Sequence, residues 1–372
     1  MASDKPQASA AHPRAAAINR LGLQLLERLG AGQPGSNLLL SPYALALSLA
    51  LASNGAAGQT RQALARTLGG EQASLEEGNQ GFGVLRTTLE QRSAQRELSL
   101  AHGVWTASRL PLSPDCLQRL QAFYAATAQT LDPGDPGAVD RINQWVSSTT
   151  RGRIEALLRR ADLASGSGCM LTNAIYFKGL WSAPFAPDAT RAMAFELPDG
   201  RHKNVPMMHQ SGQFPYFETA ESQAIALAYS GTAASMSIVL PHAGISLDMA
   251  RWEAWLPQFQ PSAVRLTLPR FSLTYEQDMQ EPLRAHGLDL VFQPAADFSA
   301  MGLTGHSITG VKHKARLEVT EEGTAAAAGS AVILGRSLHV PISMVVSRLF
   351  FCAMRDTDSG VLLFLGRIAE PA

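Results

Sequence analysis

The feature that most constrains this chain is a run of uncharged, mostly small residues late in the sequence. From Gly323 to Gly335 it reads Gly-Thr-Ala-Ala-Ala-Ala-Gly-Ser-Ala-Val-Ile-Leu-Gly, thirteen residues without a charge or a proline. Small residues and glycines favour a flexible exposed loop. Yet every residue keeps its backbone N–H and none carries a charge that burial would penalise, so the run is also compatible with a central strand. Strand-like sequence follows from Ser343 to Ile368, which favours a loop belonging to a sheet over a plain linker.

The uncharged run ends at a dipeptide that a protease could recognise. Arg336 is the first charged residue after the run, and Ser337 follows it. An arginine guanidinium pairs bidentately with a carboxylate, the group expected at the base of a trypsin-like specificity pocket. A solvated loop with an arginyl bond here is therefore a predicted substrate for a trypsin-like protease.

Composition excludes several functional classes. The 372 residues include 31 basic and 31 acidic side chains, so neither nucleic acid nor an anionic membrane is an expected partner. The three cysteines, Cys116, Cys169 and Cys352, have no paired spacing, which argues against a disulfide scaffold and signals no zinc site. The length is compatible with two domains or one large mixed domain, and no Pro/Gly/Ser-rich boundary divides the chain.

No targeting or membrane-spanning segment is predicted. The longest apolar stretch, Leu38 to Ala52, is interrupted by two serines and a proline and has the pattern of a buried helix. The residues from Met1 to Ala11 contain no hydrophobic core, so we predict no signal peptide. The sequence does not fix the location: removal of a signal peptide would favour an extracellular or periplasmic protein, and otherwise a cytoplasmic one is expected.

Apolar periodicity and capping residues predict helices early in the chain and strands mainly later. Ser41 followed by Pro42 marks one helix start, and Thr60 is a second predicted N-cap. The nearly all-apolar stretch from Cys169 to Phe177 has the pattern of a strand buried on both faces. Further helices are predicted at 18–29, 115–126, 139–148, 247–255 and 279–286, and further strands at 37–40, 98–106, 214–240 and 266–273. This order predicts an α+β fold.

Motifs for catalysis and cofactor binding are missing from the sequence. Gly30 to Gly35 is a literal G-x-G-x-x-G, but it follows a predicted helix and precedes a strand, the reverse of a dinucleotide site. There is no H-E-x-x-H, G-x-S-x-G or C-x-x-C motif. We therefore expect a protein that is not an enzyme, without cofactor or metal.

Several blocks of sequence occur together in a characteristic order. They are Asn37 to Pro42, Gly55 to Thr60, Thr172 to Trp181 with Pro184-Phe185, Val205 to Met208, His313 to Ala315, Glu321 to Thr324 with its alanine run, and Phe350 to Ile368. From about Asn37 onward the chain resembles the serpin family through these blocks. The absence of Asn-x-Ser/Thr sequons and the alanine- and arginine-rich composition suit a bacterial member.

The resemblance implies the serpin fold and a suicide inhibitor of serine proteases. The implied fold is a helix-rich N-terminal part packed on a large central mixed sheet, with smaller sheets and an exposed mobile reactive loop. It implies one domain over residues 1–372, with a disordered tail at 1–14 and the reactive-centre loop at 321–338. In such an inhibitor the protease cuts the loop, which then inserts as a strand and traps the acyl-enzyme. The partner would be a serine protease, and the protein a monomer. A non-inhibitory serpin with a carrier, chaperone or storage role is the alternative.

The resemblance also assigns roles to individual residues. The hinge that enters the sheet first comprises Glu321, Glu322, Gly323, Thr324, Ala325, Ala326, Ala327 and Ala328. Ser41, Asn173 and His313 match the polar group beneath the place where the sheet opens, and Trp181 matches the aromatic at the top of the opening. Arg270 and Glu321 are expected to form a salt bridge at the base of the loop.

Two arguments about the cleaved bond disagree. Counting from Gly323 by the commonest family spacing places it between Ser337 and Leu338, which would suit elastase- or subtilisin-like proteases. Side-chain chemistry favours Arg336-Ser337 and trypsin-like proteases, because serine offers little to a specificity pocket. We favour Arg336-Ser337 and keep Ser337-Leu338 as the second choice.

Overall fold

The computed structural model describes residues 12–33, 35–90, 96–107, 109–132, 134–164, 168–243, 251–323 and 340–371. Its helices are α1 (Ala15–Gly32), α2 (Pro42–Gly55), α3 (Gly58–Thr67), α4 (Leu75–Leu89), α5 (Pro114–Tyr124), α6 (Ala138–Thr149), α7 (Arg160–Ala164), α8 (Trp252–Trp255) and α9 (Gln280–Leu283). Its strands are β1 (Leu38–Leu40), β2 (Arg96–Ala107), β3 (Thr127–Leu131), β4 (Cys169–Gly179), β5 (Arg191–Glu196), β6 (His202–Glu218), β7 (Ser222–Ala228), β8 (Ala234–Pro241), β9 (Gln260–Pro269), β10 (Phe271–Asp278), β11 (Ile308–Val319), β12 (Ile342–Val345), β13 (Phe350–Asp356) and β14 (Leu362–Ile368).

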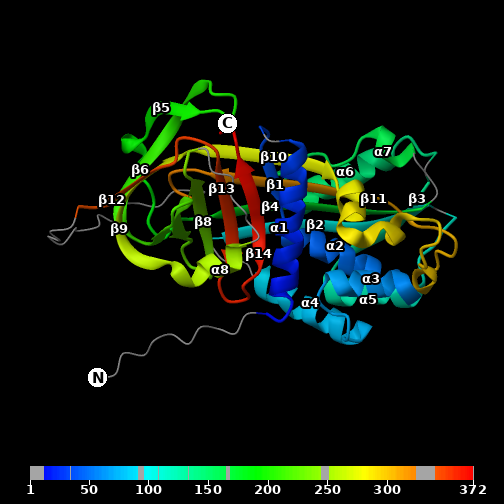
Figure 1. The fold of residues 1–372 in the computed structure, drawn as a ribbon. Coiled ribbons are helices and arrows are strands. Elements are labelled where there is room, and N and C mark those ends of the chain that lie inside the picture. The colour runs from blue at the N-terminus through cyan, green and yellow to red at the C-terminus, as the bar shows by residue number, and fades with distance from the viewer. Residues whose placement is uncertain are drawn as a thin grey trace.

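These strands form two sheets, and helices cover both faces of the smaller one (Figure 1). The larger sheet has nine strands in the order β1-β14-β13-β8-β7-β6-β9-β12, with β5 paired to β6. The smaller sheet has five strands in the order β10-β11-β4-β2-β3. Helix α2 lies against one face of the five-stranded sheet and α6 against the other. The α+β fold class is confirmed, with a mixed sheet at its centre.

A parallel junction in the five-stranded sheet, between β4 and β11, has antiparallel pairs on both of its sides, whereas the second parallel pair, β2 with β3, lies at the edge. Strands β4 and β11 keep one register from Gly310 opposite Met170 to Leu317 opposite Phe177, after a shift between Ile308 and Gly310. Strand β10 pairs antiparallel with β11, and β2 pairs antiparallel with β4. We call the parallel junction between β4 and β11 the seam.

Local sequence explains why α2 and β4 form where they do. The Ser41 hydroxyl accepts a hydrogen bond from the Ala44 N–H at 3.1 Å and Pro42 occupies the first helical turn, as the sequence predicted. The long apolar stretch divides at this cap into β1 and α2, and every residue of α2 is buried. Strand β4 is buried from Cys169 to Phe177, which confirms a strand covered on both faces.

Three element predictions are wrong. The single strand predicted at 266–273 belongs to two strands, because β9 ends at Pro269 and β10 begins at Phe271. Helix α3 begins at Gly58 instead of being capped by Thr60, because the Thr60 hydroxyl accepts the N–H of Asp297 from a distant part of the chain. The helix predicted at 279–286 is one turn of α-helix that continues as a π-helical turn at Arg284–Leu288, where Gly287 has φ of 103°. The predicted helix at 247–255 is described only from residue 251 onward, where α8 lies.

The packing divides into two hydrophobic clusters on opposite faces of the five-stranded sheet. The larger cluster contains α2 and fills the space between the two sheets. The smaller, which we call the α6 cluster, joins α6 and the segment after it to the other face. Its buried members are Ala101, Trp105, Leu131, Val139, Ile142, Val146, Ile154, Leu157, Leu158, Met170, Ala174 and Tyr176.

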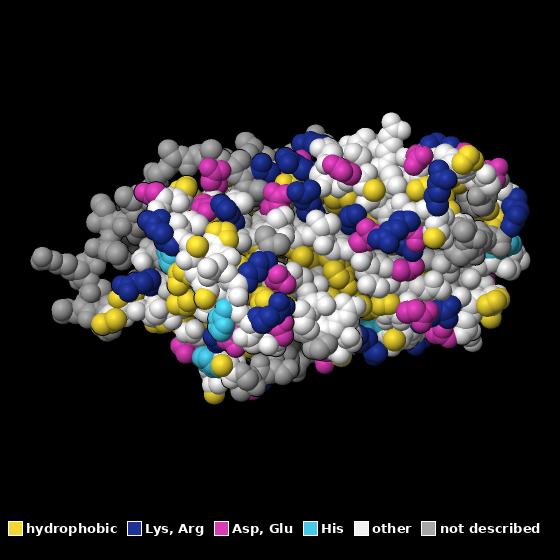
Figure 2. Space-filling view, turned by 90° about the horizontal axis from the view of Figure 1, so that it is seen from above, with side chains coloured by type: hydrophobic (Ala, Val, Ile, Leu, Met, Phe, Trp, Pro, Cys, Tyr) yellow, Lys and Arg dark blue, Asp and Glu magenta, His cyan; other side chains and the backbone are white. Residues whose placement is uncertain are grey.

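Two absences hold for the residues that the structure describes. Among them we find no helix that combines the length and the apolar character needed to cross a membrane. The same residues bring no three His, Cys, Asp or Glu side chains together as a metal site. On the face drawn in Figure 2, Lys and Arg side chains lie interspersed with Asp and Glu side chains.

Candidate functional site at the strand seam

The chain reverses direction at one end of the seam, immediately after β11. The Gly323 N–H donates to the Thr320 carbonyl at 3.2 Å, and the Thr320 hydroxyl donates to the Gly323 carbonyl at 2.8 Å. Gly323 has φ of 89°, which favours glycine. A Cβ on Gly323 would lie 2.3 Å from the Gly179 carbonyl oxygen at the end of β4, so no side chain fits there. The turn therefore places the start of the predicted loop, residues 321–323, at the end of the seam.

Trp181, which follows β4, holds this turn from the other side of the seam. Its backbone N–H donates to the Glu322 carbonyl at 3.1 Å, and its indole N–H donates to the Thr320 carbonyl at 2.9 Å. The ring stacks on Tyr229 with centroids 4.3 Å apart and is 4% exposed. Trp181 thus links the end of β4 to the base of the loop through two hydrogen bonds.

Glu321 is fixed at the base of the loop by three groups. Its carbonyl accepts the Phe185 N–H at 2.7 Å, and its carboxylate accepts the Thr190 hydroxyl at 2.8 Å. Arg270 Nη1 lies 3.4 Å from Glu321 Oε1, which is the ion pair expected from the sequence. Because the Arg270 side chain is 49% exposed, solvent weakens this pair, and the shorter Thr190 bond is the better-protected contact.

A buried polar network bridges the seam near its middle. His313 of β11 and Asn173 of β4 lie opposite each other in register, and both are 0% exposed. His313 Nδ1 donates to Asn173 Oδ1, and His313 Nε2 accepts the Ser41 N–H at 3.2 Å. The Asn173 amide donates to the Ser48 hydroxyl at 2.8 Å, and Ser48 in turn donates to the Ala44 carbonyl at 3.2 Å. The network fixes both seam strands to α2.

The structure brings three of the four predicted opening residues together. Ser41, Asn173 and His313 share the buried network, whereas Trp181 lies at the end of the seam. Ser48 also belongs to the network, although in the sequence it is only one of the two serines that interrupt the apolar stretch from Leu38 to Ala52. Its position seven residues after Ser41 on the same helix is the signal that would have identified it.

Part of the predicted site lies outside the described residues. Glu321, Glu322 and Gly323 are described, whereas the rest of the hinge (Thr324, Ala325, Ala326, Ala327 and Ala328) and the bond region (Arg336, Ser337 and Leu338) are not. Of the tail predicted at 1–14, residues 12–14 are described, and the His12 N–H donates to the Ser359 carbonyl at 2.8 Å.

Burial determines the protonation state of His313. Removal from water lowers its pKa to about 3, so the imidazole is neutral in the folded protein. The neutral form also fits the geometry, since Nδ1 donates and Nε2 accepts.

Acid should destabilise the folded protein through this residue. An unfolded histidine titrates near pH 6.5. Below that pH residue 313 therefore binds a proton in the unfolded chain but not in the folded protein. The stability contribution is present above about pH 6.5 and is lost as the pH falls toward about 3. At about pH 5 we expect a loss of about 2 kcal/mol from this group, measured as a fall in the midpoint of thermal unfolding.

A matched pair of variants isolates the effect. His313→Gln should flatten the acid-side decline, even if its stability near pH 7.5 is lower. His202→Gln, at an exposed position in β6, should leave the decline unchanged. A variant lacking His313 that declines as steeply as wild type would show that another group is responsible.

Known proteins share this fold. A family model described as Serpin (serine protease inhibitor) matches residues 16–371. The leukocyte elastase inhibitor of Bos taurus is 32% identical over 377 residues, covering 96% of this chain and 99% of the relative. Human thyroxine-binding globulin complexed with thyroxine superposes with a TM-score of 0.89 at 25% identity, covering 98% of this chain and 100% of that one. Native protease nexin-1 with heparin superposes with a TM-score of 0.85 at 26% identity, covering 96% and 100%.

These similarities define a class of proteins whose model is described as serine protease inhibitor and which also includes a thyroxine-binding member. This chain belongs to the serpin family. Within the family its relatives include a protein named as an elastase inhibitor and one named for binding thyroxine.

Proposed function

We propose that this protein is a suicide-substrate inhibitor of serine proteases, in which the cleaved loop inserts into the seam and traps the acyl-enzyme. The observation that carries the proposal is the combination of a parallel seam with a turn at its end. Strands β4 and β11 run in the same direction, so a segment that turns back after β11 runs antiparallel to both. Insertion would replace one parallel ladder with two antiparallel ladders, which are slightly more stable per residue.

The energetics favour insertion once the loop is cut. Roughly ten net hydrogen bonds at about 1 kcal/mol each would stabilise the inserted form by about 10 kcal/mol before side-chain burial. The uncut protein is then metastable and is held in that state kinetically. The hinge supports this mechanism because no residue from Gly323 to Ala328 carries a charge or a bulky side chain.

The described residues suit a seam that must open and close again. Among the described residues, one network, built on His313 and Asn173, joins the two strands by buried side chains on the α2 face. At the end of the seam the bonds from Trp181 to Thr320 and Glu322 also cross it, so these few contacts are what an entering strand would have to break. We assign Ser41, Asn173 and His313 to the opening of the seam, and Arg270 with Glu321 to the base of the loop.

The proposed target is a trypsin-like protease acting at Arg336-Ser337. Incubation with trypsin should yield a covalent complex that survives SDS, and the small C-terminal fragment released from it should begin at Ser337. Arg336→Ala should reduce trypsin inhibition by about 100-fold or more, because the charge pair in the specificity pocket is lost.

Control experiments test the position of the cleaved bond and the inhibitory mechanism separately. Arg265→Ala removes an exposed arginine of β9 and should leave inhibition unchanged. A fragment beginning at Leu338 would move the bond to Ser337-Leu338 and the target to elastase- or subtilisin-like proteases. Absence of any complex with all three protease types would contradict the inhibitory proposal.

A carrier role is the second candidate, favoured by the similarity to thyroxine-binding globulin. A cavity of about 390 Å³ lies beside Trp181, lined mostly by apolar side chains that include Phe214 and Leu227. Arg355 is the charged residue in its wall and could pair with a ligand carboxylate. Saturable thyroxine binding detected by tryptophan fluorescence, without formation of a protease complex, would favour this alternative.

A further inference from the structure

A cavity of about 240 Å³ opens among the N-terminal helices. Its walls come from the start of α1, from α2, α3 and α4, and from the end of α5, and these helices pack against one another (Figure 1). Its described lining includes no residue of β4, β11 or the base of the loop. The cavity is therefore separate from the seam and from the cavity beside Trp181.

Arg14, the residue before α1, lies in the wall of this cavity and is held there from several sides. Its guanidinium carbon lies 5.4 Å from the centre of the Phe82 ring, and Nη1 donates to the Leu68 carbonyl at 3.2 Å. Two glycines make room for the group. A Cβ on Gly70 would lie 2.5 Å from Arg14 Nη1, and a Cβ on Gly81 would lie 3.3 Å from Nε. Because the guanidinium is already fixed, an anion that binds to it immobilises little further side-chain freedom.

Two arginines at this cavity lack a carboxylate partner. Arg14 and Arg61, which lies on α3, form no ion pair within the part of the chain that the structure describes. Removal from water lowers the pKa of Arg14, because burial disfavours the charged form. A partly buried cation without a partner loses hydration and gains no compensating contact, so an anion placed beside it is stabilising.

The acidic residues near the cavity indicate the charge of a matching ligand. Glu71 in the wall is already paired with Arg66 at 3.2 Å. Glu77 is held in the capping box of α4 and attracts the Arg14 charge from beyond ion-pairing distance. Counted against Glu77, the two unpaired arginines leave one positive charge unbalanced, which matches a ligand with a single negative charge. A polyanion would meet both carboxylates and is disfavoured.

The interior of the cavity offers one hydroxyl that the protein does not use. The Tyr124 hydroxyl donates to Asn79 Oδ1 at 2.8 Å, and the Asn79 amide donates to Asn54 Oδ1 at 2.9 Å, so these groups satisfy one another. Ser53 of α2 also lines the cavity and is 9% exposed, but its hydroxyl has no hydrogen-bond partner among the described residues. A buried hydroxyl without a partner is costly, so Ser53 is available to donate to a ligand oxygen.

We infer that this cavity is a binding site for a small monocarboxylate with a flat apolar body. The carboxylate pairs with Arg14 and Arg61, and the Ser53 hydroxyl supplies a further donor. The apolar body lies against Phe82 and Leu68, which form the nonpolar part of the wall. The inference rests on the fold alone and is independent of the proposed protease inhibition.

The test uses benzoate as the probe and the uncut full-length protein. Saturation-transfer NMR should give a Kd of about 1 mM or tighter for wild type. Benzamide has the same shape without the charge and should bind about ten-fold more weakly, because the pairing with the arginines is lost. Phenyl phosphate carries close to two negative charges near pH 7.5 and should bind no more tightly than benzoate.

Three variants locate the binding. Arg61→Gln changes an exposed side chain without an ion pair among the described residues, so the fold is kept and benzoate binding should weaken about five-fold or more. Arg20→Gln removes an exposed arginine of α1 outside the cavity and should leave binding unchanged. Ala65→Phe adds a ring to the cavity wall without removing a polar group and should weaken binding about ten-fold or more.

Four outcomes would overturn the inference. Absence of a signal with wild type up to about 10 mM benzoate would show that the cavity does not bind this class of ligand. Equal affinity for benzoate and benzamide would show that the arginines do not select a charge. Unchanged binding by both Arg61→Gln and Ala65→Phe would place the benzoate elsewhere on the protein. Phenyl phosphate binding about ten-fold more tightly than benzoate would contradict a site for a single negative charge.

Discussion

Cleavage within the loop should raise the midpoint of thermal unfolding by at least about 13 °C. The inserted strand contributes about 10 kcal/mol in hydrogen bonds. A chain of 372 residues unfolds near 60 °C with an entropy of about 0.8 kcal/mol/K, so each kcal/mol shifts the midpoint by about 1.3 °C. Calorimetric scans of intact protein and of protein cut within residues 324–336 measure the difference.

The hinge supplies the control for this measurement. Thr324→Arg protein scanned soon after cleavage should gain less in its unfolding midpoint than cleaved wild type, because its loop inserts about 100-fold more slowly. Equal midpoints for cut and uncut wild type would favour the carrier alternative, in which the loop is not part of a metastable fold.

Sequence reasoning succeeded where the determining contacts are local. The Ser41 cap depends on an N–H only three residues away, and the burial of β4 follows from an unbroken apolar stretch. The position expected for Trp181 came instead from the family resemblance of the block Thr172 to Trp181, and not from a local contact.

Sequence reasoning failed where the partner lies far along the chain. Thr60 has the residue type of an N-cap, but its hydroxyl binds Asp297, 237 residues away, and the helix begins earlier. The contact between Thr190 and Glu321 spans 131 residues and was likewise not predicted. Neither contact leaves a local signature, because a threonine at a cap and one at a tertiary contact look alike in sequence.

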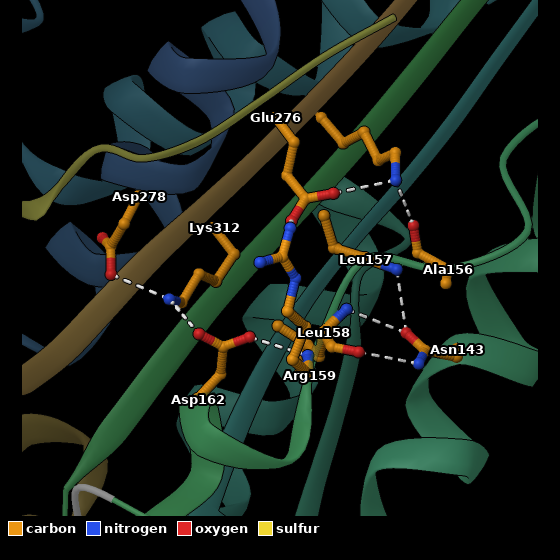
Figure 3. A network of polar contacts seen from close by, with 10 residues as sticks. Asn143, Ala156, Leu157, Leu158, Arg159, Asp162, Glu276, Asp278 and Lys312 are labelled. Atoms are coloured by element: carbon orange, nitrogen blue, oxygen red, sulfur yellow. Dashed lines mark hydrogen bonds and ion pairs between the residues drawn. The ribbon is translucent and has the colours of Figure 1, made fainter.

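Residues 151–162, which follow α6, illustrate the same limit for charged residues. Asp162 and Lys312 are 150 residues apart in the sequence, so no local pattern predicts that they pair (Figure 3). The Arg153 guanidinium lies over the Tyr176 ring of β4, 5.3 Å from its centroid, whereas Arg159 pairs with Glu276 of β10 on the other side of the seam. The sequence shows which residues are charged, but which of them form contacts depends on how the strands and helices are arranged in the fold.

A substitution in the hinge, Thr324→Arg, should have a large effect on protease trapping. Thr324 would be the first side chain to enter between β4 and β11, because it follows Gly323, whose position at the end of the seam leaves no room for a Cβ. Thr324→Arg would place a charge in apolar surroundings and should slow insertion by about 100-fold. Trypsin should then cleave the loop and leave before it is trapped, so the yield of SDS-resistant complex should fall at least about ten-fold while cleavage continues. Val340→Arg adds the same charge at a 91% exposed position beyond the loop and should trap trypsin as wild type does. If Thr324→Arg gives as much complex as wild type, the loop does not act by inserting from this end of the seam.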